Sequence, residues 1–196
     1  MGAETFEESG VLVVEGKAMT KIIVLPMDKD TLDQINQCDA SFTIDSKLVL
    51  SAENGKIHYT TVDVPPFTKQ YATDEVDYTT FLSNPDKVVF FAYVDEELAG
   101  QVRVMKYWNG YAYIDDVAVD TKFRRQGVGR ALIERAIEWA KERKLPGLML
   151  ETQNNNVAAC TLYARCGFEL RGFDTHLYKG LDLNTEEIAL YWYLIF

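Results

Sequence analysis

The sequence predicts an α/β (α+β) fold in which a mixed central β-sheet is flanked by helices. Three observations support this prediction. Short β-type runs follow one another closely between residues 88 and 119. At Gly129 the apolar period changes from two to about 3.6, which is the period of an amphipathic helix. Strand patterns return at Leu148 and again near the end of the chain, so strands enclose the helices in chain order.

The front of the chain predicts a strand, a short helix and a hairpin. Ile22–Leu25 is a β-type run, and Asp28–Gln37 is expected to be a helix with its first residue as the N-cap. Two further β-type runs, Lys47–Ser51 and Lys56–Val62, flank the pair Asn54-Gly55. This pair is typical of a two-residue hairpin turn.

The next segment, Val64–Asp86, has a different composition. It contains Pro65-Pro66 and the acidic residues Asp74, Glu75 and Asp77. We expect an irregular segment with about one helical turn. Long segments of this kind inside a compact domain are often binding loops, and a solvated acidic loop is the equal alternative.

The second half of the chain predicts an antiparallel meander, two helices and closing strands. The expected meander strands are Val88–Val94, Leu98–Met105 and Tyr111–Val119, the expected helices are Gly129–Arg143 and Asn156–Cys166, and the other expected strands are Leu148–Thr152, Phe173–Tyr178 and Ile188–Phe196. Because a helix connects the third meander strand to the strand at Leu148, these two strands are expected to be parallel. Gly167 is expected to end the second helix as its C′ residue.

Length and charge bound the domain and its partners. A chain of 196 residues suits one domain, here residues 19–196. The Glu- and Gly-rich residues 1–18 are expected to be a mobile N-terminal extension. Thirty Asp and Glu against 20 Lys and Arg give a net charge of −10. Such a surface disfavours nucleic acid and anionic lipid and favours cationic partners, although an ordinary cytosolic surface is charged in the same way.

The cysteines and histidines predict neither a disulfide framework nor a metal site. Cys38, Cys160 and Cys166 are an odd set without CxxC pairing, and the two histidines form no ligand cluster. No apolar stretch is long enough to span a bilayer, and residues 1–18 lack a signal-peptide pattern. A cytoplasmic location is therefore expected, and a homodimer is one assembly that the sequence allows.

The sharpest local motif is the turn Arg124-Arg125-Gln126-Gly127-Val128-Gly129-Arg130, which lies between a strand and a helix. Glycines at positions i and i+2 allow a tight turn and a close approach of the backbone to a ligand. The first amides of the helix then point outward at the positive end of its dipole, which favours phosphate or pyrophosphate. Neither GxxxxGK[ST] nor GxGxxG is present. An ordinary glycine-containing loop with solvated arginines is the alternative.

A second motif follows on the next predicted helix. Asn156, Ala159, Tyr163 and Cys166 recur at intervals of three and four, so they share one face. An amide, a small residue and a phenol on one stripe suit a ligand groove. The alternative is a core tyrosine with a local hydrogen-bond partner.

Together the two motifs resemble the GCN5-related N-acetyltransferase (GNAT) superfamily. The R/Q-x-x-G-x-G/A motif of that superfamily is matched by Arg124, Gly127 and Gly129, and its N-x-x-A-x-x-x-Y-x-x-x-G-F pattern by Asn156, Ala159, Tyr163, Gly167 and Phe168. Residues 39–43, 150–168 and 189–191 look more narrowly like the streptothricin (nourseothricin) acetyltransferases, in a likeness that spans roughly residues 21–196.

The resemblance implies a co-substrate and a mechanism. GNAT enzymes hold acetyl-CoA in a V-shaped opening between two parallel strands, here Tyr111–Val119 and Leu148–Thr152, and need no metal. The amine attacks the thioester directly, and Tyr163 would protonate the departing thiolate. The resemblance assigns the co-substrate to the backbone of Val117, Ala118 and Val119, to the amides of Arg125, Gln126, Gly127, Val128, Gly129 and Arg130, and to Arg124, Asn156, Ala159 and Tyr163. Streptothricin-type enzymes acetylate an amino group on the β-lysine part of the antibiotic.

The acceptor amine must lose a proton before it attacks, because a lysine-like ammonium has a pKa near ~10.4. Asp115 and Asp116 are the first candidates for the base. Since neighbouring strand residues face opposite sides, only one of them is expected to reach the substrate, and we favour Asp115. Glu151 and the acids of the Val64–Asp86 segment are expected to dock a small cationic substrate.

Two other functions fit the same motifs. One is a GNAT enzyme that acts on a polyamine, an aminoglycoside or a protein N-terminus. The other is a non-catalytic module that senses acyl-CoA, against which the retained Tyr163 and acidic pair argue.

Overall fold

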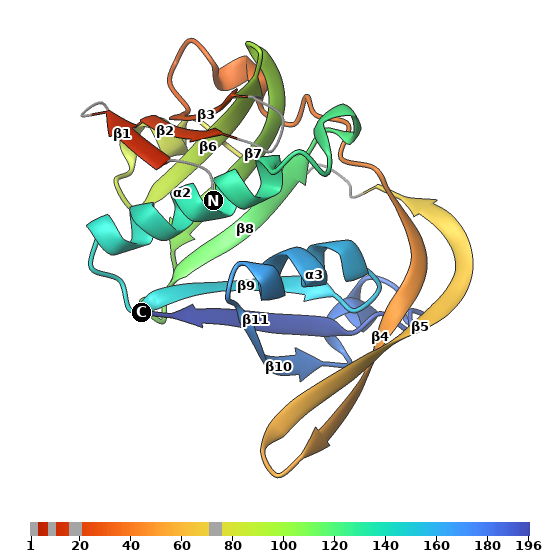
Figure 1. Ribbon diagram of the computed structural model, residues 1–196. Helices are drawn as coiled ribbons and strands as arrows, with labels where there is room; N and C mark the ends of the chain where they lie inside the picture. The colour runs from red at the N-terminus through yellow and green to blue at the C-terminus, as the bar shows by residue number, and fades with distance from the viewer. Residues whose placement is uncertain (1–3, 8–10, 16–20, 71–75) are drawn as a thin grey trace.

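The computed structural model describes residues 4–7, 11–15, 21–70 and 76–196. The main-sheet strands are β1 (Glu4–Glu7), β2 (Val11–Glu15), β3 (Lys21–Pro26), β6 (Lys87–Val94), β7 (Glu97–Lys106), β8 (Ala112–Val119), β9 (Gly147–Gln153), β10 (Glu169–Asp174) and β11 (Ala189–Ile195). A separate hairpin consists of β4 (Phe42–Glu53) and β5 (Lys56–Lys69), and the helices are α1 (Thr80–Ser83), α2 (Val128–Glu142) and α3 (Val157–Arg165). The main sheet runs in the order β1-β2-β3-β6-β7-β8-β9-β11-β10 (Figure 1).

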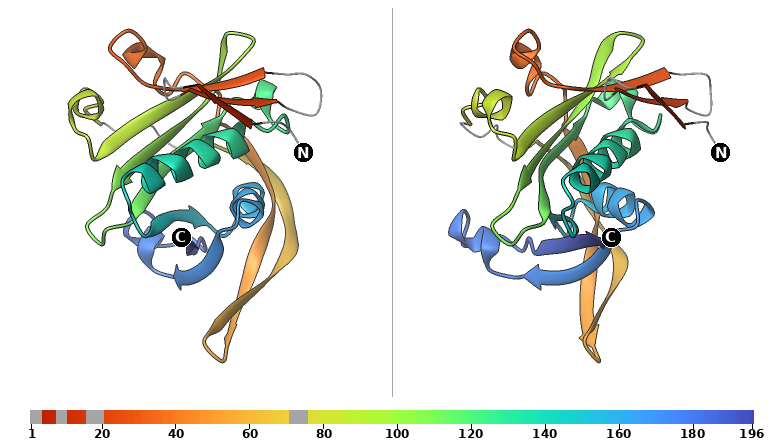
Figure 2. Two further views of the ribbon diagram at one scale, coloured as in Figure 1. Left: turned by 60° about the vertical axis from the view of Figure 1, so that its left-hand side comes forward. Right: turned by 90° about the vertical axis from the view of Figure 1, so that its left-hand side faces the viewer.

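Helices α2 and α3 lie on the same face of the main sheet (Figures 1 and 2). The apolar stripe of α2 is fully buried against the sheet at Leu132, Ile133 and Ala136, as the helical period predicts. Helix α3 packs on β11 through Tyr163 and Trp192, whose ring centroids are 6.4 Å apart. The mixed α/β architecture expected from the sequence is therefore confirmed.

The parallel pair separates partway along its length. Strand β8 pairs antiparallel with β7 from Ala112 to Val119, whereas its parallel pairing with β9 covers only Ala112, Tyr113 and Ile114. Helix α2 makes the crossover between the two parallel strands. Beyond Ile114 on β8 and Leu150 on β9 the strands diverge, which confirms the expected V-shaped opening.

A β-bulge in β8 corrects the expectation for the two central acids. Arg103 pairs with Asp116, whereas the next residue of β7, Val104, pairs with Ile114. Asp115 therefore has no partner in the register and is the inserted residue of the bulge. Arg103 and Gln101, two residues apart on β7, face the same side. Arg103 contacts Asp115 and Gln101 contacts Asp116. The two carboxylates therefore share one face of the sheet, and the expectation that they face opposite sides was wrong.

The β4–β5 hairpin is confirmed and is longer than expected. Asn54 and Gly55 both have positive φ, 52° and 75°, as a two-residue type I′ turn requires. Strand β5 continues to Lys69, so the first part of Val64–Asp86 is not irregular as predicted. The strand accommodates Pro65-Pro66 because the register of the hairpin shifts at these residues, between the pair Ser46–Asp63 and the pair Ile44–Phe67. A bulge tolerates residues that cannot donate to the ladder.

Three other elements differ from the prediction. Asp28–Gln37 contains only a short 3₁₀ turn, η1 (Leu32–Gln34). The Asp28 carboxylate accepts bonds from the amides of Asp30 and Thr31 and forms a local turn instead of the expected helix. The strand expected at 173–178 lies earlier, at β10, and is followed by the 3₁₀ turn η3 (Leu177–Gly180).

The third difference concerns the start of the chain, which was expected to be a mobile extension over residues 1–18. Strands β1 and β2 lie within that range, and β2 pairs antiparallel with β3. The open backbone groups of β3 provide a template for such added strands. The described part of this segment is thus continuous with the main sheet.

Within the described ranges, no helix is long and apolar enough to cross a membrane. In the same residues, no group of three or more His, Cys, Asp or Glu side chains could hold a metal ion.

Candidate active site

The turn before α2 exposes the first amides of the helix. Gly127 precedes the helix with φ of 99°, a left-handed conformation that favours glycine. The first intrahelical bond of α2 is donated by the Ala131 amide to the Gly127 carbonyl at 3.0 Å. The amides of Val128, Gly129 and Arg130 come before that bond, in the first turn of the helix. They lie at the positive end of the helix dipole, so the turn can hold an anion.

The side chains of the turn are anchored to different degrees. The Arg124 guanidinium donates to the Val119 carbonyl at 3.2 Å and ties the turn to the end of β8. Arg125 has φ of 66° and is exposed. Arg130 forms an i,i+4 ion pair with Glu134 at 2.6 Å, yet its side chain is 70% exposed. Gln126 donates to the Lys122 carbonyl at 3.1 Å. Positive charge thus remains available beside the first amides of α2.

Gly129 serves packing as well as the turn. A Cβ at this position would lie 3.1 Å from Leu162 Cδ2 of α3 and 3.5 Å from Val119 Cγ2 of β8. The glycine therefore lets α2, α3 and the end of β8 meet closely. This close approach puts α3 next to the open side of β8, where Val117, Ala118 and Val119 lie beyond the parallel pairing.

Tyr163 lies on α3, and Asn156 lies directly before its first residue, as the sequence spacing indicated. Tyr163 is 7% exposed and packs against Phe168 and Trp192. The Asn156 side-chain oxygen accepts the Ala159 amide at 3.2 Å and so caps the helix, a structural role that the sequence analysis did not give it. Gly167, with φ of 91°, ends α3 as predicted. Contacts of Asn156, Ala159 and Tyr163 with the co-substrate remain predictions.

Asp115 and Asp116 belong to a polar network on the sheet face opposite α2. Arg103 is 6% exposed, and its Nε lies 2.5 Å from Asp115 Oδ2. Gln101 donates to Asp116 Oδ2 at 2.7 Å. Tyr78 accepts a bond from the Arg103 guanidinium at 2.9 Å. Both carboxylates, including the favoured Asp115, are thus engaged in holding the sheet face and the segment before α1 together.

The remaining acids predicted to dock the substrate are scattered. Asp74 and Glu75 lie outside the described residues. Asp77 is exposed and accepts bonds from the amide and hydroxyl of Thr79 at 3.0 and 2.6 Å, which starts α1. Of the acids in this set that the structure describes, Glu151 lines a cavity.

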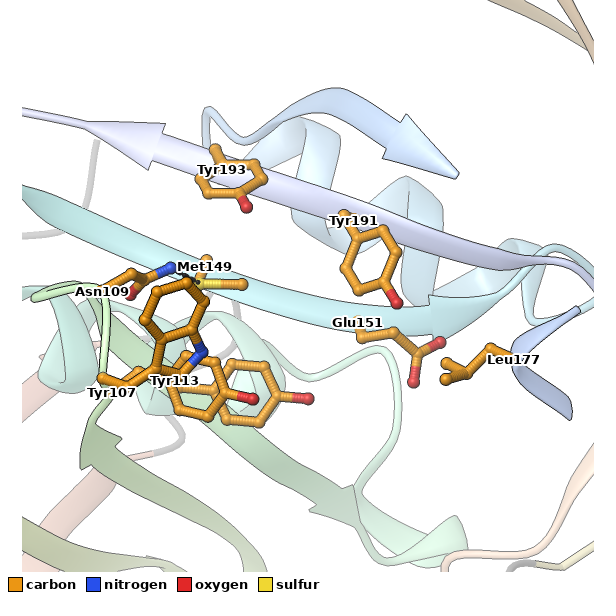
Figure 3. Close-up of a pocket in the computed structure, with 9 residues that line it drawn as sticks. Tyr107, Asn109, Tyr113, Met149, Glu151, Leu177, Tyr191 and Tyr193 are labelled. Carbon is orange, nitrogen blue, oxygen red and sulfur yellow. Dashed lines mark hydrogen bonds between the residues drawn. The ribbon is translucent and has the colours of Figure 1, made fainter. Parts of the chain in front are cut away.

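That cavity, which we call the aromatic pocket, measures about 410 Å³ and opens on the face of the sheet opposite α2. Five aromatic residues and one carboxylate dominate its lining: Tyr107, Trp108, Tyr113, Tyr191, Tyr193 and Glu151. Strand pairing brings them together, since Met149 lies between Tyr113 and Tyr193, and Glu151 lies opposite Tyr191. Figure 3 shows Glu151 and Leu177 at one end of the pocket and Tyr107 and Asn109 at the other.

Glu151 stands where the parallel strands part, because it follows Leu150, the last residue of β9 that pairs with β8. Burial raises the pKa of the Glu151 carboxyl above its ordinary value, and the nearby Glu187 acts in the same direction. The Tyr178 hydroxyl donates to Glu151 and partly offsets this effect on the pKa. A half-buried carboxylate with a raised pKa beside an opening is suited to accept a proton from a substrate.

The aromatic residues of this pocket were missed in the sequence. One signal was present: Tyr191 and Tyr193 are two apart on the last strand, as are Tyr111 and Tyr113 earlier, and this is the period of one strand face. No such signal was present for Tyr178. This residue lies on η3, far from Glu151 in the chain, and the fold brings the two together.

Comparisons with known proteins agree with this geometry. The family model described as "Acetyltransferase (GNAT) family" matches residues 58–168. Streptothricin acetyltransferase A of Bacillus subtilis (strain 168) is 36% identical over 175 residues, which cover 89% of this chain and all of the relative. Streptothricin acetyltransferase of Escherichia coli is 37% identical over 88% of this chain and 94% of its own length.

A solved structure agrees as well. A protein from Bacillus anthracis str. Ames, described as a streptothricin acetyltransferase in complex with acetyl coenzyme A, superposes with a TM-score of 0.83 at 41% identity. The match covers 89% of this chain and 97% of that one.

Proposed function

The chain belongs to the GNAT family of N-acetyltransferases, and we propose that it transfers the acetyl group of acetyl-CoA to an amino group of a streptothricin-type antibiotic. The observation that carries this proposal is the full-length similarity to streptothricin acetyltransferases. The aromatic pocket with its single carboxylate supports a cationic acceptor, because aromatic faces and a carboxylate both attract cations.

The residues of the opening fit acetyl-CoA as co-substrate. The amides of Val128, Gly129 and Arg130 and the exposed Arg125 suit its pyrophosphate. The stretch of β8 from Val117 to Val119 pairs with β7 but lies beyond the pairing with β9, and this edge suits an extended amide chain. When bound, acetyl-CoA supplies a thioester, an activated acetyl group.

The chain's own residues supply the proton transfers. Glu151 takes a proton from the acceptor ammonium, and the neutral amine nitrogen then forms a bond to the acetyl carbon as the carbon–sulfur bond breaks. The attacking nitrogen releases its second proton to solvent as the amide forms. The Tyr163 hydroxyl gives its proton to the departing thiolate and regains one from solvent. We prefer Glu151 to Asp115 as the base because Asp115 pairs with the buried Arg103, whereas Glu151 lines the pocket.

The substrate assignment is tested by measuring thiol release from acetyl-CoA with a panel of amines. We expect purified enzyme to acetylate streptothricin with a higher kcat/KM than polyamines, aminoglycosides or peptides with free N-termini. Cells that express the chain should also survive streptothricin. Efficient turnover of another amine, with streptothricin untouched at saturating acetyl-CoA, would remove the substrate assignment and leave the acetyltransferase activity intact.

The co-substrate site is tested at Gly127. Gly127→Val should weaken acetyl-CoA binding about tenfold or more, because a β-branched residue does not adopt the left-handed φ and the amides would turn away from the pyrophosphate. A Cβ at Gly127 has room, with Ile22 Cδ1 at 3.7 Å, so the fold should persist. Gly55→Val, which also replaces a positive-φ glycine, is the matched control in titration calorimetry. Equal affinities in both variants would mean that the pyrophosphate lies elsewhere.

A further inference from the structure

Three residues form an aromatic wall at one end of the aromatic pocket: Tyr107, Trp108 and Tyr113. The rings of Tyr107 and Tyr113 stack with centroids 4.8 Å apart and an interplanar angle of 25°. The Trp108 ring lies 6.1 Å from that of Tyr107. Trp108 is 85% exposed, whereas the other two tryptophans, Trp139 and Trp192, are 2% and 1% exposed. An indole left in water at the rim of a cavity is available to a ligand.

The turn that carries the wall is already organised. The Tyr107 amide donates to the Tyr111 carbonyl at 2.8 Å, and the Gly110 amide donates back to the Tyr107 carbonyl at 3.0 Å. The Asn109 side chain accepts the Tyr111 amide at 3.2 Å and lies 3.1 Å from the Met149 sulfur on β9. These bonds fix the backbone of the turn that carries the wall, so little backbone entropy is lost when a ligand binds.

The aromatic wall differs from several other aromatic rings of the described residues, which carry a lysine or arginine over one face. Five rings outside the pocket carry a lysine or arginine over their faces: those of Tyr78, Phe81, Phe90, Trp139 and Phe196. No lysine or arginine from the described residues lines the aromatic pocket, whose one charged lining residue is Glu151. The wall is therefore an electron-rich surface without a positive partner among the described residues.

The wall is also separate from the carboxylate. Tyr113 pairs with Met149, two residues before Glu151 on β9, which corresponds to a distance of about 6.6 Å along the strand. Tyr107 stacks on Tyr113, and Figure 3 shows it at the end of the pocket away from Glu151. One cationic group cannot occupy both places, whereas two cations of one molecule can.

We propose that the aromatic wall is a second-cation subsite, which holds an ammonium or guanidinium group of the acceptor other than the amine that is acetylated. This inference rests on the proposed function, because it takes the aromatic pocket as the acceptor site. It makes the enzyme selective for acceptors with at least two cationic groups, with one at Glu151 and another on the face of Trp108.

The first test measures binding at Trp108 directly. Because the other two tryptophans are buried, quenching of tryptophan fluorescence by acrylamide reports mainly on Trp108. We expect 1,5-diaminopentane to protect Trp108 at concentrations about 2- to 30-fold lower than 1-aminopentane, the range that one cation–π contact provides. Equal protection by the two amines would overturn the subsite.

The second test uses variants and the inhibition of acetyl transfer by the same two amines. Trp108→Leu should abolish most of the preference for the diamine, Trp108→Phe should retain most of it, and Phe67→Leu, an exposed aromatic outside the pocket, should leave it unchanged. A preference that survives in Trp108→Leu, or a loss of affinity that is equal for both amines, would overturn the proposal.

The two proposals can fail independently. If streptothricin is not acetylated and the diamine preference still depends on Trp108, the antibiotic assignment falls and the subsite stands. If streptothricin is acetylated with the same KM in Trp108→Leu, the subsite falls and the assignment stands.

Discussion

Glu151→Gln is expected to lower kcat/KM for the acceptor amine by about 10²- to 10⁴-fold, the usual loss when a general base is removed. Glutamine keeps the shape of the side chain and can still bond to Tyr178, but it cannot accept a proton from the ammonium. Acetyl-CoA affinity should change little, because the co-substrate amides belong to the turn before α2. Steady-state kinetics and calorimetry on the same preparation separate these effects.

Asp115→Asn and Asp116→Asn are the matched controls for Glu151→Gln. Asp115→Asn should chiefly lower Tm, since it removes the carboxylate that lies 2.5 Å from Nε of the buried Arg103. Asp116→Asn should have a smaller effect, because an amide can still bond to Gln101. If Asp115→Asn abolishes turnover in a folded protein while Glu151→Gln retains it, Asp115 is the base.

The pH dependence of the rate also tests the assignment of Glu151 as the base. The base acts when deprotonated, so the rate should rise as pH increases through the pKa of Glu151, which burial holds above the ordinary carboxyl value. The titratable groups of the described residues that interact with this carboxyl are Tyr178, Glu187, Tyr113 and Tyr191. Tyr178→Phe removes the bond that lowers the pKa, so the acidic limb of the pH–rate profile should move to higher pH. The profile of Glu151→Gln should lack that limb.

Tyr163→Phe is expected to lower kcat by about 10²-fold while acetyl-CoA binding stays nearly unchanged. The value lies at the lower end for loss of a general acid, because a thiolate leaves fairly well without protonation. Phenylalanine keeps the packing against Phe168 and Trp192, so the fold should be retained. Tyr59→Phe is the matched control, since the Tyr59 ring contacts the same Trp192 at 6.0 Å and is 42% exposed. An unchanged kcat in Tyr163→Phe, with chemistry shown to be rate-limiting, would exclude Tyr163 from the mechanism.

Local sequence was sufficient for the parts of the molecule that depend on neighbouring residues. The glycine turn before α2, the type I′ turn at Asn54-Gly55 and the end of α3 at Gly167 were all predicted, because each depends on a backbone conformation that few residues adopt. The parallel crossover followed from the helix between β8 and β9. The homodimer and the cytoplasmic location remain predictions.

Local sequence was insufficient where partners distant in the chain decide the outcome. The strand expected at 173–178 moved to β10, and residues of the expected N-terminal extension lie in β1 and β2, because strand pairing depends on which edges are open. The helix expected at Asp28–Gln37 was replaced by a local turn, where a side chain competes for the backbone amides.

Patterns of nearby residues were enough to predict the family, the glycine turn before α2 and the place of Tyr163 on α3. Which acid lines the aromatic pocket, by contrast, depended on contacts between distant parts of the chain. Asp115 is the extra residue of the β8 bulge. The register between β7 and β8 therefore places it on the same face as Asp116 and beside the buried Arg103. Glu151 shares a pocket with five aromatic residues because β8, β9 and β11 pair in one particular register. Register is a property of the folded sheet, since a shift by one residue would send each side chain to the other face.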